Sequence, residues 1–316
     1  MSPKAKPADT TARITREQIA AQAKAASAKV FVWPAPPYYE FSDPSAAAAA
    51  DECMLIFRDG GKAAGKLLDF HPDQGQLKFV YEKNLTAFPT LVAVLGRLTG
   101  LSAPEFGIAP GMTVAAALKV VLHAPLATEG QLVSRPRVRE VIDKGPNSAA
   151  ILEITRDLST PGGRLVATVD NSNLARKQGG FGGKVTAIAP PHQVPATAPH
   201  RIIDLPTPPN LALLYRLTGD MNPLHSDPEH ARAVGFERPI LHGAATYGAA
   251  AHAVVRHIGY CAERLASIEA RFVRPVFPGD TLRTEIWQED DRISFQCGVP
   301  GRDGLVLTNG LAVLRQ

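Results

Sequence analysis

Strand-like runs of apolar and β-branched residues, separated by turn signals, are the feature of this sequence that most limits its fold. A first set covers residues 113–123, 131–143, 149–157 and 165–173. Stretches such as Asp143-Lys-Gly-Pro146 and Thr160-Pro-Gly-Gly163 break the chain between these runs. A second set covers residues 267–274, 280–289, 292–299 and 305–314. The pattern predicts two groups of antiparallel strands, one in each half of the chain.

A helix is expected ahead of each group of strands. Residues 243–259 are dense in small residues and end at Gly259, which is typical of a helix that lies close to a sheet. In the first half, apolar residues recur at near-helical spacing over 84–99, around Pro89. A short helix should begin at Pro228 and end at Gly235. One helix and a run of strands in each half predict the α+β class.

Proline marks the expected boundary between the halves. Residues 188–199 hold four prolines in twelve positions, which is typical of a linker. We therefore expect a flexible N-terminal tail over 1–29, a first domain over 30–187, a linker over 188–200 and a second domain over 201–316.

Composition excludes several classes of protein. The chain has 316 residues, 45% of them hydrophobic, which is enough for two packed domains. A net charge of +4 is compatible with an anionic ligand, and no block of Lys and Arg with interleaved aromatics indicates a nucleic-acid partner. No apolar run is long enough for a membrane span. Three widely separated cysteines (Cys53, Cys261 and Cys297) indicate reduced thiols and a cytoplasmic protein.

The stretch from Tyr215 to His225 carries the clearest chemistry. It places Asp220 and His225 five residues apart, with Asn222 and Pro223 between them. Pro223 prevents a regular helix through the segment, so the two side chains should sit on a rigid turn. An acid and a base that share one water molecule suit the addition of water to a double bond, or its removal. The alternative interpretation is a helix cap with a surface pair.

The continuation of this stretch to His242-Gly243 resembles the (R)-specific enoyl-CoA hydratase signature of the MaoC-like, hydratase 2 family. The resemblance runs from about residue 77 to 316 and includes 77–90, Gly179-Gly-Phe-Gly-Gly183 and 271–280. It implies a double hot-dog fold, with two antiparallel sheets each wrapped around a central helix. It also implies hydration of trans-2-enoyl-CoA to (R)-3-hydroxyacyl-CoA in fatty acid metabolism, without a metal or a redox cofactor, and with an acyl-CoA thioester as the only ligand.

The resemblance also assigns roles to single residues. Asp220 and His225 would activate water as the catalytic pair, Asn222 would fix the site, and the N–H of Gly243 would bind the thioester oxygen at a helix start. We expect His242 to be structural. The glycine run lacks the ending of a phosphate-binding P-loop. Its Phe181 and Gly182, together with Arg271, are the candidates for substrate binding; Arg274 and Lys184 are further candidates for the phosphates of coenzyme A.

One departure from the family pattern leaves the substrate open. Family members of this type carry a His-Gly-Glu stretch where this chain has Ala115-Ala-Ala117. The N-terminal half would then be a non-catalytic copy that shapes the acyl site. The alternatives are a dehydratase for a carrier-bound or branched acyl thioester, a non-catalytic thioester-binding protein and, more remotely, a thioesterase. A homodimer is compatible with the sequence, as is a monomer, because two hot-dog units already reproduce the usual dimer.

Overall fold

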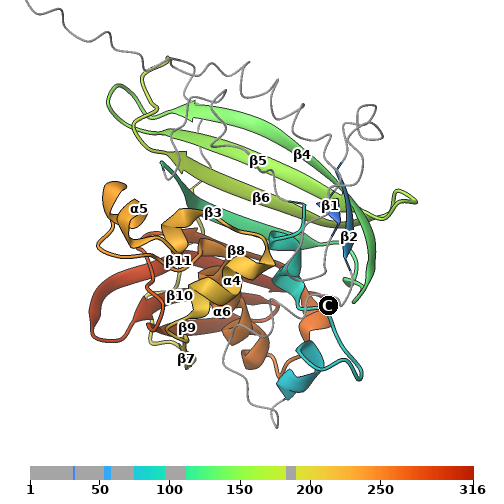
Figure 1. The fold of residues 1–316 in the computed structure, drawn as a ribbon. Helices are drawn as coiled ribbons and strands as arrows, with labels where there is room; N and C mark the ends of the chain where they lie inside the picture. Colours follow the sequence, from blue (N-terminus) through green and yellow to red (C-terminus); the bar gives the residue numbers. More distant parts are fainter. Residues whose placement is uncertain (1–30, 33–52, 58–74, 97–111, 183–189) are drawn as a thin grey trace, which may run out of the picture.

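The computed structural model describes residues 31–32, 53–57, 75–96, 112–182 and 190–316, so the expected tail over 1–29 lies outside the described residues. Eleven strands form one sheet in the order β1-β2-β4-β5-β6-β3-β8-β11-β10-β9-β7 (Figure 1). The strands are β1 (Phe31–Val32), β2 (Cys53–Phe57), β3 (Thr113–Leu122), β4 (Gly130–Asp143), β5 (Ala150–Ser159), β6 (Leu165–Ala175), β7 (Arg201–Pro206), β8 (Leu265–Phe272), β9 (Thr281–Glu289), β10 (Arg292–Val299) and β11 (Arg302–Leu314).

Short helices accompany the sheet, and one long helix packs on it. They are η2 (Leu77–Phe79), η3 (Pro89–Ala93), α4 (Leu211–Tyr215), η5 (Arg216–Thr218), η6 (Pro223–His225), α5 (Pro228–Ala233), α6 (Gly243–His257) and η7 (Ala262–Arg264), where η marks a 3-10 helix. The eight strands expected from the sequence are all present, within a few residues of their expected ends. Turn residues delimit strands well because they cannot continue the ladder.

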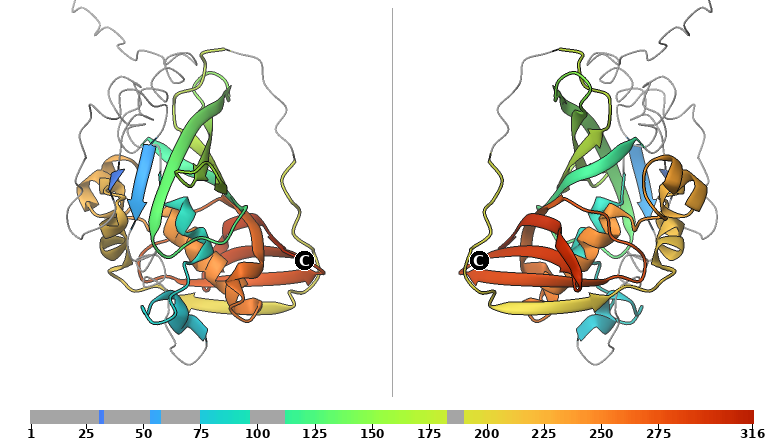
Figure 2. Two further views of the ribbon diagram at one scale, coloured as in Figure 1. Left: turned by 90° about the vertical axis from the view of Figure 1, so that its right-hand side faces the viewer. Right: turned by 90° about the vertical axis from the view of Figure 1, so that its left-hand side faces the viewer.

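The two halves of the chain meet edge to edge. Strand β3 of the first half pairs antiparallel with β8 of the second, from Ala117 opposite Arg271 to Val121 opposite Ser267. Within the first half β4, β5, β6 and β3 are neighbours, and within the second β8, β11, β10, β9 and β7 are neighbours. The expected pair of sheets is therefore joined through one ladder into a continuous sheet (Figure 2).

Helix α6 is the central helix of the second half. Its fifteen residues include six alanines and two glycines, and most of its side chains are buried. It packs against β7, β8, β9 and β10, which small side chains permit at short range. Tyr247 is fully buried, and its hydroxyl donates to the carbonyl of Ile268 over 2.7 Å. Burial raises the pKa of Tyr247 well above its ordinary value, so this donor keeps its proton.

The prediction of a helix over 84–99 is wrong for the residues that the structure describes there. Only Pro89–Ala93 turn, as the 3-10 helix η3, with Pro89 at its start. Arg156 on β5 explains the difference. Its guanidinium donates to the carbonyls of Val92, Ala93 and Leu95, and also to Asn171. A longer α-helix would need those carbonyls for its own N–H groups. The apolar spacing therefore reports burial of the segment and not its helical length.

The proline-rich stretch lies along the second half. Residues 190–200 form no helix or strand. Hydrogen bonds to the C-terminal sheet fix them, among them His192 Nε2 with Ser294 Oγ over 2.8 Å, Asn309 Nδ2 to the His192 carbonyl over 2.7 Å, and Trp287 Nε1 to the Thr197 carbonyl over 2.8 Å. The stretch is thus a strap on the C-terminal sheet. The division into domains at this point stays a prediction.

Replacing Arg156 should destabilise the fold far more than replacing an exposed arginine. Arg156→Met keeps much of the side-chain length but leaves three buried carbonyls without their donor, which should cost on the order of 3 kcal/mol of unfolding free energy. The matched control is Arg137→Ala, which breaks a solvent-facing ion pair with Asp157 and should cost less than about 1 kcal/mol. Urea denaturation measures both. Equal losses in the two variants would contradict the role given to Arg156.

Candidate functional site

The segment from Leu211 to His225 folds as a chain of short turns. Helix α4 runs directly into η5, and Gly219 ends that turn with a φ of +113°, a conformation that favours glycine. Asn222 then caps η6: its side-chain oxygen accepts the N–H of Leu224 over 3.0 Å, and Pro223 takes the first helical position. Asp220 therefore lies between two tight turns, as expected from the sequence.

Three ionisable side chains meet at this point. Each of Asp220, His225 and His242 places one oxygen or nitrogen atom within 4.8 Å of the other two. His225 and His242 are 8% and 1% exposed, and Asp220 is partly buried. The structure thus brings together the two residues expected to hold water, and it adds a second histidine.

Backbone carbonyls orient both imidazole rings. Nδ1 of His225 lies 2.8 Å from the carbonyl oxygen of Ile240, and Nε2 of His242 lies 3.1 Å from that of Asp220. A carbonyl only accepts, so each of these nitrogens is assigned the proton. In a neutral ring the other nitrogen is then the acceptor, which is Nε2 in His225. The tautomer of each ring is set by main-chain atoms.

The rings also pack on one another. His225 and His242 are stacked with centroids 3.8 Å apart and planes 28° apart, and Tyr215 lies 4.6 Å from His242 on a tilted plane. The sequence treats His242 as structural and gives Tyr215 no role. The stack keeps the ring of His225 from turning. The position of His242 next to Gly243 is the one signal in the sequence that could have placed it in the site.

The same three groups could offer ligands to a metal ion, but the ring geometry favours water. Nitrogen ligands point their lone pairs at a zinc ion from about 2.0–2.1 Å, in the plane of each ring. Two stacked rings point their lone pairs side by side, so they do not converge on one point. The absence of a metal from the reaction stays a prediction.

Gly243 stands at the start of α6, beside this group. The first N–H groups of a helix have no acceptor within it and can bind an oxygen. A Cβ added at Gly243 would lie 3.4 Å from the ring of Phe272 and 3.5 Å from the Cβ of Ala115. Ala115 is exposed on β3. Position 115, where the family's His-Gly-Glu stretch is missing, therefore faces the helix start that we expect to bind the thioester.

The remaining predicted site residues lie outside the Asp220–His225–His242 group. Arg271 lies on β8 opposite Ala117 and Thr308, and Phe181 packs on the cluster of Val141, Ala150, Leu152, Ile154 and Ala175. Gly182 lies in a loop closed by Asp143. Their part in substrate binding stays a prediction, and Lys184 lies outside the described residues.

The glycine loop is held closely and specifically. The Asp143 carboxylate accepts the backbone N–H groups of Gly145, Gly180 and Gly182 over 2.7–2.8 Å. These bonds, that from Gly180 foremost, hold the pKa of Asp143 below its ordinary value. A side chain at Gly179 would collide with the carbonyls of Gly145 and Ala149. The described part of the loop, Gly179 to Gly182, is therefore closely packed at Gly179 and bound to Asp143.

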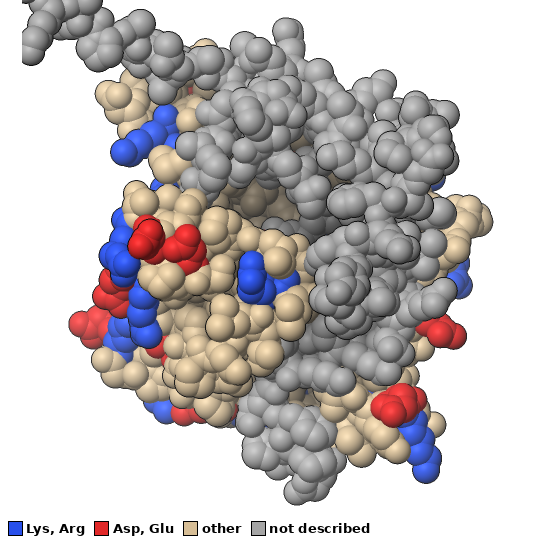
Figure 3. Space-filling model, in the orientation of Figure 1, with Lys and Arg blue, Asp and Glu red and all other residues tan. Residues whose placement is uncertain are grey.

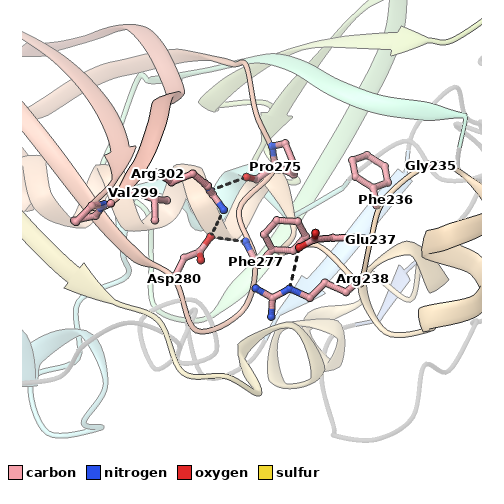
Figure 4. A pocket seen from close by; sticks show the side chains of 11 residues that line it. Gly235, Phe236, Glu237, Arg238, Pro275, Phe277, Asp280, Val299 and Arg302 are labelled. Atoms are coloured by element: carbon pink, nitrogen blue, oxygen red, sulfur yellow. Dashed lines mark hydrogen bonds and ion pairs between the residues drawn. The ribbon is translucent and has the colours of Figure 1, made fainter.

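An open groove of about 660 Å³ lies on the outer side of the segment that leads to Ile240. Phe236, Arg238, Phe277 and Arg302 are among its lining residues (Figure 4). Arg302 is fixed by Asp280 and by the Pro275 carbonyl, each over 3.0 Å, and Arg238 lies over the Phe277 ring at 4.5 Å.

Lys and Arg alternate with Asp and Glu at the edge of the C-terminal half (Figure 3), so no large patch of one sign forms on that edge.

A joined pair of strand groups with a small-residue helix, and an Asp–His pair at its start, define a hot-dog protein of the hydratase type. A family model described as "MaoC like domain" matches residues 190–305. The chain is 36% identical over 270 residues to 3-hydroxyacyl-thioester dehydratase Y of Mycobacterium tuberculosis, covering 83% of this chain and 93% of that protein. It is also 36% identical over 255 residues to the peroxisomal enoyl-CoA hydratase 2 of Arabidopsis thaliana, covering 74% and 81%. The chain belongs to the MaoC-like, hydratase 2 family.

Solved structures agree with this assignment. A MaoC-like dehydratase from Phytophthora capsici is 29% identical with a TM-score of 0.73, covering 84% of this chain and 95% of that one. The full-length peroxisomal multifunctional enzyme type 2 of Drosophila melanogaster is 26% identical with a TM-score of 0.74, covering 84% and 48%. A Mycobacterium tuberculosis protein described as a double hotdog fold matches at 14% identity and a TM-score of 0.50, covering 80% and 89%. The expected double hot-dog fold is confirmed. None of the described helices could cross a membrane.

A methyl group at Gly243 should lower turnover strongly while the protein stays folded. Gly243→Ala meets its neighbours at ordinary contact distances, so thermal stability should change little. The methyl would occupy the approach of the thioester oxygen, and turnover should fall on the order of 10²-fold. Gly248→Ala in the same helix is the control: its new Cβ meets nothing within 4 Å, so it should stabilise by about 0.5–1 kcal/mol and retain turnover. If the Gly243→Ala protein keeps the turnover of the parent, Gly243 does not lie where the thioester oxygen binds.

Proposed function

We propose that this protein is a hydro-lyase that adds water to trans-2-enoyl-CoA and gives (R)-3-hydroxyacyl-CoA, reversibly. One observation carries the proposal: Asp220 and His225 converge beside Gly243, where α6 begins. The two relatives reported above bear names for the two directions of this reaction, enoyl-CoA hydratase and 3-hydroxyacyl-thioester dehydratase. Membership of their family supports the same chemistry here.

The residues suggest how the reaction proceeds. A water molecule held between the Asp220 carboxylate and Nε2 of His225 loses a proton to this pair as its oxygen bonds to the β-carbon. The electrons of the double bond move to the thioester oxygen, and the Gly243 N–H stabilises the resulting enolate. A proton returned from the same pair to the α-carbon completes the hydration. The Ile240 carbonyl holds Nδ1–H of His225, so Nε2 is the nitrogen that faces the water.

The competing proposal is a dehydratase for a carrier-bound or branched acyl thioester. The small side chains of residues 115–117 favour it, because Ala115 approaches Gly243 and stands where the family pattern has a larger His side chain. The chemistry at Asp220 and His225 would be the same, and only the accepted acyl group and its carrier would differ. A cytoplasmic location and a homodimer stay predictions.

Asp220→Asn and His225→Ala should each lower turnover about 10²–10⁴-fold, because each removes one proton-handling group of the pair. Both variants should remain folded by circular dichroism, since each changes one side chain at the edge of the core. Asp227→Asn is a matched control: Asp227 caps α5 through its side chain, and asparagine caps a helix equally well. Near-normal turnover in either site variant would exclude the proposed mechanism.

The substrate assay follows the loss of enoyl-thioester absorbance with crotonyl-CoA and with longer trans-2-enoyl-CoAs, followed by chiral analysis of the product. We expect hydration to the (R)-isomer, unchanged after treatment with a chelator, because no step of the mechanism uses a metal. Turnover only of branched or carrier-bound thioesters would favour the competing proposal. An (S)-product would contradict the proposed placement of water.

A further inference from the structure

One segment of the second half, residues 234–243, supplies or orients three groups of the site. It contributes the Ile240 carbonyl that orients His225, the ring of His242 that stacks on His225, and the Gly243 N–H. Between Val234 and His242 it has no helix or strand of its own to hold it. Its shape therefore depends on contacts with neighbouring parts of the molecule.

Some of those contacts come from the second half itself. The N–H of Ile240 donates to the Leu224 carbonyl over 3.3 Å, and that of Leu241 donates to the Val276 carbonyl over 2.7 Å. Leu224, Ala231 and Ile240 form a small buried cluster, and Val234, Phe236 and Phe277 pack against it. This cluster adjoins His225 through both Leu224 and Ile240, so a shift of Phe236 would be passed to the catalytic histidine.

Arg176 of the first half reaches the same segment. It follows directly after β6, and its backbone N–H is bonded to the Met112 carbonyl over 2.9 Å. Its Nη2 donates to the Val234 carbonyl over 3.0 Å, and its guanidinium lies over the Phe236 ring, 5.5 Å from the centroid. A planar guanidinium can donate at its edge and stack on its face at once, which a lysine cannot do.

We propose that Arg176 is a positioning residue for the active site, through which the N-terminal half holds the segment that carries Ile240, His242 and Gly243. The proposal rests on the function proposed above. It gives the N-terminal half an indirect part in catalysis, through the segment that carries Ile240, His242 and Gly243. Arg176 makes two contacts with the segment. Its hydrogen bond fixes the main chain at Val234, and its guanidinium, lying over the ring, fixes the side chain of Phe236.

The test compares Arg176→Ala, Arg176→Lys and the control Arg137→Ala in the full-length protein. A displacement of about 1 Å at a site can cost about 10²-fold in rate. We therefore expect kcat of Arg176→Ala to fall about 10–100-fold, with KM within about twofold of the parent. Arg176→Lys should recover part of kcat, because it keeps a donor and loses the stack. Arg137→Ala should retain the parent kcat, since its partner Asp157 lies within the first half.

A second measurement does not need turnover. Hydrogen–deuterium exchange of the unliganded protein should show faster exchange over 240–243 in Arg176→Ala, and unchanged exchange there in Arg137→Ala. If kcat of folded Arg176→Ala equals that of the parent, or falls only with its unfolded fraction, the proposal is overturned. Unaltered exchange over 240–243 overturns it as well. If the parent protein hydrates no enoyl thioester, the proposed function fails, while the exchange result still decides whether Arg176 orders the segment.

Discussion

The close packing of α6 on the joined sheet is the constraint on which the rest of the structure depends. Alanine and glycine on this helix let the strands approach it, and larger side chains would push them apart. The start of α6 then lies beside the seam between β3 and β8, where Phe272 and Ala115 approach Gly243 from the two halves. The first N–H groups of a helix have no acceptor within it, so those of α6 lie at this seam without an intrahelical partner.

Main-chain carbonyls, more than side-chain partners, define the chemistry of the site. The carbonyls of Ile240 and Asp220 each bind one nitrogen of a histidine, and so decide which nitrogen can accept a proton. A carbonyl fixed in a folded segment cannot rotate away or titrate, so the histidine tautomer that it selects persists as long as the backbone keeps its conformation. The orientation of His225 and His242 consequently depends on how residues 234–243 are held, and Arg176 connects that segment to the other half of the molecule.

The sequence predicts those features that local patterns determine. The eight strands, α6 and the turn around Pro223 follow from turn residues, small residues and proline, which act within a few positions of themselves. His242 and Arg156 were beyond such patterns, because the role of each is created by a distant partner: the stack on His225 joins positions seventeen residues apart, and Arg156 reaches carbonyls more than sixty residues away. The apolar spacing over 84–99 had the same limit. It indicated correctly that much of the described part, 84–96, is buried, but it predicted a longer helix than the η3 turn that forms there.

The two halves share a strand plan, but the helices that the structure describes in them, η3 and α6, differ in their hydrogen bonding. In the second half, the carbonyls of α6 bond within the helix, so a regular helix of fifteen residues presents its N-terminal N–H groups at the seam. In the part of the first half that the structure describes, η3 packs on β3 and β6, and Arg156 takes the carbonyls of Val92 and Ala93. The five-residue 3-10 turn η3, with its carbonyls bound to a cation, does not itself continue into a helix like α6. The proposed donor to the thioester oxygen therefore lies in the second half, at the start of α6, and the proposed task of Arg176 in the first half is to position the segment that leads to it.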